Sequence, residues 1–162
     1  MNICHTYLDT PVGTILLAGS GGSLMTLKFP SDAVPVPPEE NWERNDGLFK
    51  EVKEQLRSYF IGGLQSFEVP LAPDGTPFQL KVWEALRSIP YGETISYREL
   101  AIRIGHPKAV RAVGGANGRN PIPVIIPCHR VIGSDGALAG FSGGIGIKKK
   151  LLGIEGVAFE ER

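Results

Sequence analysis

The first part of the chain alternates short apolar stretches with turn-forming residues. Apolar residues gather at 3–8, 14–18 and 23–29, and Gly- or Pro-containing turns fall at 10–13 and 19–22. Short apolar stretches bounded by such turns are typical of β-strands joined by tight connections. The pattern therefore predicts a β-meander at the N-terminus.

A loop and one amphipathic helix follow the meander. Four prolines between positions 30 and 40 predict an irregular connection. Apolar residues then recur at helical spacing from 48 to 60, with Asn45 or Asp46 as the N-cap and Gly62-Gly63 as the end of the helix. Residues 66–69 form a further candidate strand, and residues 70–75 are expected to be a linker.

The second half has a helical pattern. Thr76-Pro77-Phe78-Gln79 forms a capping box with proline at the first helical position, and Ser96-Tyr97-Arg98-Glu99 forms a second one. The helix that starts there should run to Ile104, turn at 105–107 and continue as a second helix at 108–118. Two helices joined by a short Gly-containing turn predict a helix-turn-helix, although helix pairs also occur in proteins that do not bind DNA.

The second helix of this pair consists almost entirely of small residues, around a single long charged side chain, Arg111. Gly114 and Gly115 each cost a helix about 1 kcal/mol relative to alanine. Small side chains allow another surface to approach closely. That surface is either the backbone of DNA or a neighbouring helix.

A cysteine beside two basic residues follows this helix. Residues 124–126 predict a short buried strand, which Pro127 should break just before Cys128. His129 and Arg130 favour the thiolate, the reacting form of a cysteine, although a lone cysteine is also a common core residue. Farther on, the sequence predicts a turn at 133–136, a flexible loop at 140–144 and a short helix at 148–152 with solvated lysines.

Charge is unevenly distributed along the 162 residues. The formal net charge is zero, but residues 1–75 carry 5 Lys or Arg against 10 Asp or Glu, whereas residues 76–162 carry 12 against 7. The halves thus have charges of −5 and +5. The asymmetry indicates either that the second half faces an anionic partner or that the two halves attract each other.

Composition narrows the class of protein. With 42% hydrophobic and 21% charged residues, the chain has the composition of a soluble globular protein. No apolar run approaches the about 20 residues that span a membrane, and no secretory signal is visible. Two distant cysteines suit a reducing compartment, so we expect the cytoplasm, or the nucleus in a eukaryote. Cys4 and His5 alone do not make a metal site, and no metal is expected.

The sequence Pro-Cys-His-Arg-Val at 127–131 resembles the active-site signature of the O6-alkylguanine-DNA alkyltransferases. The resemblance extends over about 76–156 and, more loosely, over the N-terminal half. It implies an α/β N-terminal domain with a small antiparallel sheet at 1–75. It also implies a mostly helical C-terminal domain of winged helix-turn-helix type at 76–162. The implied activity is a single, irreversible transfer of an alkyl group from O6 of guanine in double-stranded DNA to a cysteine, by a monomer without a cofactor.

The resemblance also implies roles for individual residues. Cys128 would be the acceptor, Glu155 would hold His129, Tyr97 would give a proton to the departing guanine, and Asn120 would tie the recognition helix to the cysteine segment. The implied DNA contacts are Ala109, Arg111, Ala112, Gly114, Gly115, Asn117 and Arg130, with Arg111 filling the gap left by a nucleotide flipped through the minor groove. The implied substrate contacts are Val131, Phe141, Ser142 and Gly143. Phe141 departs from the tyrosine that is usual in the family.

The residues themselves suggest a chemical problem. Successive side chains of an extended segment point to opposite faces, so we expect a bridging water molecule rather than a direct contact between the Cys128 sulfur and the His129 imidazole. A thiol with a pKa of about 8.5 is already about one tenth thiolate near neutral pH, so full ionisation would add only about tenfold in rate. Two alternatives remain open: a lesion-binding module without transfer, which in related proteins lacks the cysteine, and a thiol hydrolase using Cys128 and His129.

Overall fold

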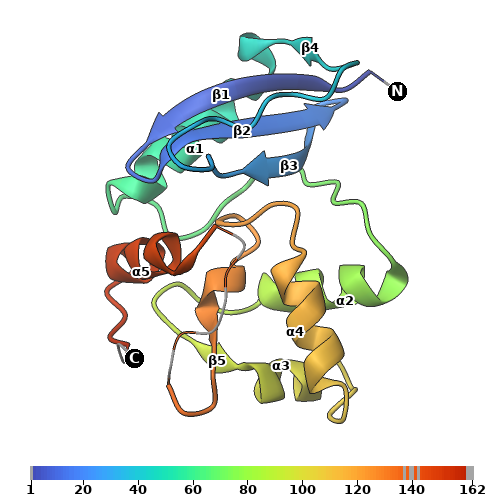
Figure 1. Ribbon diagram of the computed structural model, residues 1–162, viewed down its shortest axis with the longest axis vertical. Coiled ribbons are helices and arrows are strands. Elements are labelled where there is room, and N and C mark those ends of the chain that lie inside the picture. Colours follow the sequence, from blue (N-terminus) through green and yellow to red (C-terminus); the bar gives the residue numbers. More distant parts are fainter. Residues whose placement is uncertain (1, 137, 139–140, 142, 160–162) are drawn as a thin grey trace. The chain divides into compact units, whose positions relative to one another are not determined.

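The computed structural model describes residues 2–136, 138, 141 and 143–159. The chain divides into two compact units, Met1–Asp74 and Gly75–Arg162. Figure 1 shows strands with a helix in the first unit and mainly helices in the second.

The N-terminal unit is built on a four-stranded sheet with the order β3-β2-β1-β4. Strands β1 (Cys4–Thr10), β2 (Gly13–Ser20) and β3 (Ser23–Lys28) are antiparallel neighbours, which confirms the predicted meander. The short β4 (Glu43–Arg44) pairs in parallel with β1, so the sheet is mixed at this edge.

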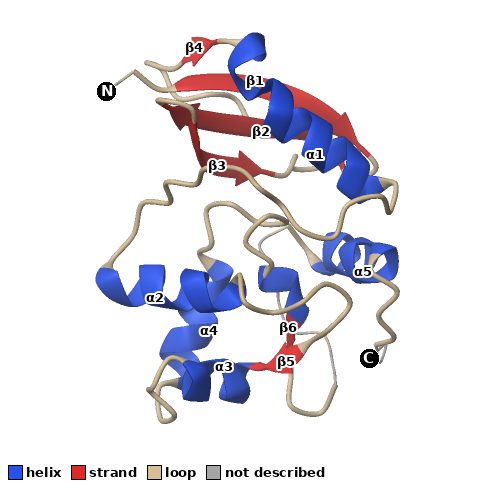
Figure 2. Cartoon of the chain, turned by 180° about the vertical axis from the view of Figure 1, so that it is seen from behind, coloured by secondary structure: helices blue, strands red, loops and turns tan. Residues whose placement is uncertain are grey.

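One helix covers a face of this sheet. A 3₁₀ turn, η1 (Asp46–Phe49), leads into α1 (Lys50–Phe60), and the Asn45 side chain caps η1 by accepting from the Leu48 amide. Val52, Leu56 and Tyr59 of α1 are buried, and α1 lies against one face of the sheet (Figures 1 and 2). Gly62, at φ +80°, follows the helix as expected.

The strand expected at 66–69 is wrong. Residues 66–69 have no strand geometry, and their neighbour Leu71 makes only an isolated parallel bridge with Leu24. The Gln55 side chain on α1 accepts a hydrogen bond from the Glu68 amide and donates one to the Glu68 carbonyl. The backbone polar groups of Glu68 are thus satisfied by a side chain rather than by a strand neighbour.

The C-terminal unit is mainly helical. It contains α2 (Pro77–Leu86), α3 (Tyr97–Arg103), α4 (Val110–Gly118), the 3₁₀ turn η2 (Cys128–Arg130) and α5 (Ile145–Ile154). Strands β5 (Ile95–Ser96) and β6 (Val131–Ile132) pair in parallel and place the start of α3 beside the end of η2 (Figure 2).

The sequence predicted the two helix starts of this unit. Thr76 and Gln79 form the complete capping box of α2, and the Ser96 hydroxyl accepts from the Glu99 amide at the start of α3. Gly105, at φ +81°, turns the chain between α3 and α4, so the helix pair is confirmed. The indole of Trp83 on α2 donates to the Ala116 carbonyl of α4 at 2.8 Å, which fixes α4 against the core.

Candidate active site

The segment leading to Cys128 is a compact turn and not the strand expected at 124–126. Val124 has a φ of +74°, an unfavourable conformation for a β-branched residue, which persists only where the surroundings enforce it. The Ile126 amide donates to the Ile122 carbonyl at 2.9 Å. Asn120 braces the turn, because its Nδ2 donates to the Ile126 carbonyl at 2.7 Å and its Oδ1 accepts from the Ile122 amide.

Cys128 is the first residue of η2 and is only 2% exposed. Burial raises the pKa of its thiol to about 11, although the Asn120 side chain and the positive charge of Lys148 oppose the shift. The groups that favour the thiolate are Asn120 and Lys148, and the expectation that His129 and Arg130 would also do so stays a prediction. With its pKa raised, the buried thiol is neutral near pH 7, so a base must remove its proton before sulfur can react.

His129 and Glu155 form a buried pair beside the cysteine. The His129 Nε2 lies 2.6 Å from Glu155 Oε2, and both side chains are fully buried. Burial lowers the pKa of the imidazole and the Glu155 carboxylate opposes this, so a neutral ring donates its Nε2–H to the carboxylate. Because Cys128 and His129 belong to a 3₁₀ turn, the premise that they point to opposite faces of an extended segment is wrong.

Arg130 is buried and does not lie on a DNA-facing surface, which corrects its expected role. Its side chain is 7% exposed, and its Nε donates to Glu155 Oε1 at 2.8 Å. Its two other nitrogens donate to Glu155 Oε2 and to the Ile89 carbonyl. An arginine committed to three acceptors inside the fold is not available to a phosphate.

Lys148 is also buried, whereas the sequence placed it on a solvated face. Its side chain is 0% exposed, and its Nζ donates to the Val131 carbonyl at 2.7 Å. Burial lowers the pKa of this lysine to about 8. The helical periodicity contained the signal, because Lys148 shares one face of α5 with Leu151, Leu152 and Glu155 at positions i, i+3, i+4 and i+7.

Tyr97 begins α3 and is close to both Cys128 and α4. Burial, and then the Cys128 charge, raise the pKa of its hydroxyl, so the group stays protonated at neutral pH. A Cβ placed on Gly114 would lie 3.8 Å from the tyrosine ring. Asn117, expected to contact DNA, is instead 4% exposed and its Nδ2 donates to the Cys128 carbonyl at 3.4 Å. The inner face of α4 thus supports the cysteine.

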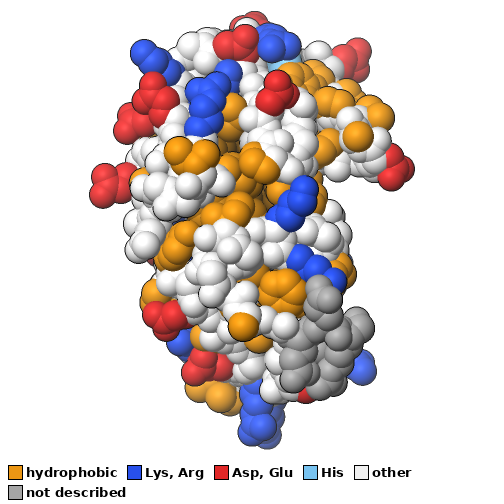
Figure 3. Space-filling view, turned by 90° about the vertical axis from the view of Figure 1, so that its left-hand side faces the viewer, with side chains coloured by type: hydrophobic (Ala, Val, Ile, Leu, Met, Phe, Trp, Pro, Cys, Tyr) orange, Lys and Arg blue, Asp and Glu red, His pale blue; other side chains and the backbone are white. Residues whose placement is uncertain are grey.

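The outer face of α4 is exposed. Arg111 and Ala112 are exposed, Ala109 and Gly115 are half-buried, and Arg119 lies one further turn along. Gly114 is also half-buried and borders the Tyr97 ring. Residues 97–120 contain five Lys or Arg and one acidic residue, a formal charge of +4, and all five basic side chains are exposed. Figure 3 shows Lys and Arg side chains projecting at the end of this unit formed by α3 and the following turn.

The expected substrate contacts are only partly described. Ser142 lies outside the described residues. Phe141 and Gly143 are half-buried, and the Phe141 carbonyl accepts from the Gly144 amide at 2.8 Å, next to the start of α5. Val131 is fully buried, so its side chain belongs to the core.

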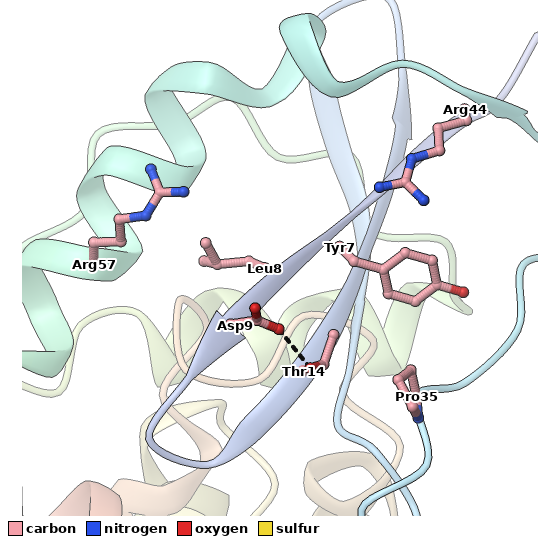
Figure 4. A pocket seen from close by; sticks show the side chains of 7 residues that line it. All are labelled: Tyr7, Leu8, Asp9, Thr14, Pro35, Arg44 and Arg57. Carbon is pink, nitrogen blue, oxygen red and sulfur yellow. Dashed lines mark hydrogen bonds between the residues drawn. The ribbon is translucent and has the colours of Figure 1, made fainter.

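Two surface hollows lie outside this cluster. One, of about 510 Å³, is in the N-terminal unit (Figure 4), where Arg44 and Arg57 stand on opposite sides and do not converge. Asp9 there accepts from Thr14, and Arg44 pairs with Asp46. The other, of about 420 Å³, is lined by residues 105–109 at the α3–α4 turn. Among the described residues, no three His, Cys, Asp or Glu side chains could hold a metal ion, and no helix could span a membrane.

Comparison with known proteins matches both units to one family. Residues 77–157 match the DNA-binding domain of 6-O-methylguanine DNA methyltransferase, and residues 3–73 match the ribonuclease-like domain of the same family. A methylated-DNA–protein-cysteine methyltransferase of Methanosarcina acetivorans is 49% identical over 94% of this chain and 97% of its own length. That of Haemophilus influenzae is 44% identical over 98% and 89%.

Solved structures agree with these sequence matches. An O6-methylguanine methyltransferase of Mycobacterium tuberculosis has a TM-score of 0.88 at 46% identity, covering 98% of this chain and 96% of its own. The same organism's protein in complex with DNA gives 0.87 at 46% identity, with 96% and 93% covered. A buried cysteine with a His–Glu pair thus lies in the same unit as an exposed basic helix pair. The chain belongs to the 6-O-methylguanine DNA methyltransferase family.

Proposed function

We propose that this chain repairs DNA by moving an alkyl group, typically methyl, from O6 of guanine in double-stranded DNA to Cys128. The protein acts as a methylated-DNA–protein-cysteine methyltransferase and each molecule acts once. The observation that carries the proposal is the buried Cys128, placed one residue before His129 and its carboxylate partner, in the unit that matches the family's DNA-binding domain.

Proton removal begins the reaction. The resting thiol is neutral because burial raises its pKa, so a base must take its proton before sulfur can attack. His129 is that base, because its Nε2–H is committed to Glu155 and its Nδ1 then carries the lone pair. A water molecule relays the proton from Cys128 to His129 in this proposal. Lys148 and Asn120 favour the thiolate once it forms.

The transfer is a single displacement in line with the leaving oxygen. A bond forms between the Cys128 sulfur and the alkyl carbon while the bond between that carbon and the guanine O6 breaks. The electron pair of the broken bond goes to guanine, and the Tyr97 hydroxyl, protonated at neutral pH, donates a proton to the departing base. The proton that left the thiol restores the tyrosine, so a thiol is converted into a thioether and an alkylguanine into guanine.

DNA is bound by the exposed helix pair. The target carbon is hidden in the duplex, so the nucleotide must be extruded before it can reach a sulfur that is 2% exposed. The small residues Ala112, Gly114 and Gly115 allow α4 to approach the DNA through the minor groove. Arg111 occupies the gap in the base stack, and the +4 charge of residues 97–120 attracts the phosphates.

The remaining assignments come from the resemblance to the family. Asn120 and Asn117 hold the cysteine segment, and Phe141, Ser142 and Gly143 border the base, in a chain acting as a monomer without cofactor. Residues 1–75 have a structural role, and residues 76–162 carry DNA binding and transfer. An acceptor thiol must stay reduced, which suits the cytoplasm, or the nucleus of a eukaryotic source.

Intact mass spectrometry after mixing with a duplex containing O6-methylguanine tests the proposal. The expected result is one added methyl group per protein molecule, located on Cys128, with unmodified guanine left in the DNA. Binding without a mass change would indicate a lesion-binding module. Many lesions processed per molecule would indicate a thiol hydrolase.

A further inference from the structure

Arg130 binds the Glu155 carboxylate through two of the three nitrogens of its guanidinium. Its Nε lies 2.8 Å from Glu155 Oε1 and its Nη2 lies 3.2 Å from Oε2. The third nitrogen, Nη1, donates to the Ile89 carbonyl at 2.7 Å, and the guanidinium lies 5.8 Å from the centre of the Tyr91 ring. The guanidinium is therefore held in one orientation by the Ile89 carbonyl as well as by Glu155.

Both oxygens of the Glu155 carboxylate have further hydrogen-bond partners. Its Oε1 also accepts from the Gly92 amide at 3.0 Å, and its Oε2 is the atom that faces His129 Nε2 at 2.6 Å. Arg130 and Gly92 set the rotation of the carboxylate, and this rotation decides which oxygen meets the imidazole. All four groups are in the C-terminal unit.

We propose that Arg130 is a positioning residue for alkyl transfer, which acts by aiming Glu155 at His129 so that the imidazole keeps its proton on Nε2. The inference rests on the proposed function, because His129 must serve as the base for its tautomer to matter. Arg130 does not touch the DNA or the thiol in this role. It links the Ile89–Gly92 turn and the end of α5 to the histidine that follows the acceptor cysteine.

The charges around His129 give this role a pH signature. Glu155 and Lys148 face His129 from α5 and its end, and Arg130 and Cys128 face it from η2. Tyr91, in the turn after α2, acts on Glu155. Tyr97, on α3, acts on Cys128. Burial lowers the pKa of His129 most, Glu155 raises it, and the Arg130 charge lowers it. Removing the arginine charge should therefore raise the imidazole pKa, whereas removing the carboxylate charge should lower it.

The test uses Arg130→Met, Glu155→Gln and the double variant in the full chain. Arg87→Met is the matched control, because Arg87 follows α2 in the same unit, is exposed and pairs only with Glu84 among the described residues. The substrate is O6-benzylguanine as the free base, so that DNA binding does not enter. The rate of benzyl transfer is measured by intact mass in single turnover from about pH 5 to pH 9.

Arg130→Met is expected to slow transfer by about 10–100-fold and to move the acid side of the pH profile to higher pH. Glu155→Gln should move it to lower pH. Because the chain has 3 histidines, ¹⁵N spectra of His5→Gln/His106→Gln protein isolate the ring of His129, and Arg130→Met should reduce its Nε2–H tautomer. An Arg130→Met protein in which the ring of His129 keeps the wild-type fraction of its Nε2–H tautomer would overturn the inference.

The double variant keeps the test decisive if Arg130→Met alone does not fold, since an unpaired Glu155 would be left buried. Removing both charges avoids that penalty. If Arg130 acts only through Glu155, the double variant reacts as fast as Glu155→Gln. A folded double variant that is a further tenfold slower would contradict the inference. If the wild type does not accept the benzyl group, the same rates are measured with a duplex containing O6-methylguanine, and failure to transfer the methyl group there would instead contradict the proposed function.

Discussion

The His129 imidazole and the Glu155 carboxylate meet at 2.6 Å with both side chains fully buried, although 25 residues separate them in the chain. The contact joins η2 to the end of α5. A carboxylate at one ring nitrogen makes the other nitrogen more basic and fixes its tautomer. We therefore expect the contact to affect transfer more than DNA binding.

Glu155→Gln should slow single-turnover transfer by about 10–100-fold and leave the affinity for DNA unchanged. The neutral amide no longer raises the pKa of His129, so the rate should fall off at a lower pH on the acid side than in the wild type. Transfer is measured across pH by intact mass, and DNA binding by fluorescence anisotropy.

Glu93→Gln is the control for this variant, because Glu93 is an exposed glutamate of the same unit. Glu155→Gln leaves the buried Arg130 without its carboxylate, which costs about 3–5 kcal/mol of stability, so rates are compared well below the melting temperature of the variant. A rate equal to that of wild type at every pH would remove Glu155 from the mechanism.

Cys128→Ser should bind damaged DNA and transfer nothing, because a neutral hydroxyl is a far weaker nucleophile than a thiolate. The substitution changes one atom and fits the same space. Wild type incubated with a methylated duplex should gain one methyl group in mass, and Cys128→Ser should gain none. A methyl group on the serine variant would show that the acceptor lies elsewhere, and the half-buried Cys4 would be the next residue to replace.

Cys128 should also make the stability of the protein fall at alkaline pH. Burial raises the pKa of its thiol from 9.0 to about 11, so the unfolded chain loses this proton first. The contribution is fully present below about pH 9 and is lost as the pH rises towards about 11, by at most about 1.4 kcal/mol per pH unit. Lys148, whose pKa burial lowers to about 8, has the opposite effect between about pH 8 and 10.5.

The comparison of Cys128→Ser with wild type isolates the thiol. The free energy of unfolding is measured by urea titration from pH 8 to 11, and the serine variant should become progressively more stable than wild type above about pH 9. Cys4→Ser serves as the control, since Cys4 is only half-buried. A constant difference between Cys128→Ser and wild type over this range would mean that the thiol ionises at its ordinary pH in the folded protein.

Local patterns in the sequence predicted most of the elements. The capping box at Thr76, the cap at Ser96 and the Gly105 turn depend on contacts within four residues, so the sequence contains all the information that they need. The β-meander follows in the same way from short apolar stretches between turns. The segment at 124–126 differs, because Asn120 organises it into a turn that an apolar run does not reveal.

The partners of the buried charged side chains were not predictable in the same way. The periodicity of α5 puts Lys148 on the buried face, but Arg130 has no such pattern, and the partners of both residues lie far away in the chain, at Glu155 and the Val131 carbonyl. The sequence places such partners together only once the fold is known. The resemblance to the family supplied the pairing of Glu155 with His129, which spacing alone does not indicate.

Arg111→Ala should separate nucleotide extrusion from alkyl transfer. Arg111 is exposed on α4, and its proposed role is to fill the gap left in the base stack. Extrusion costs a few kcal/mol, so loss of the Arg111 side chain should slow reaction with a duplex by about one to three orders of magnitude. Free O6-benzylguanine needs no extrusion and should react at nearly the wild-type rate.

Lys108→Ala provides the matched control, because Lys108 is exposed at the α3–α4 turn and adds charge without reaching the base stack in this proposal. Removing a phosphate contact should weaken binding to all duplexes alike and reduce the dependence of affinity on salt. Arg111→Ala should instead lose most on a lesion that is well paired and stacked, and least on one opposite an abasic site. Equal losses on the free base and the duplex would mean that Arg111 supports the fold or the acceptor site, and the proposed role in extrusion would be abandoned.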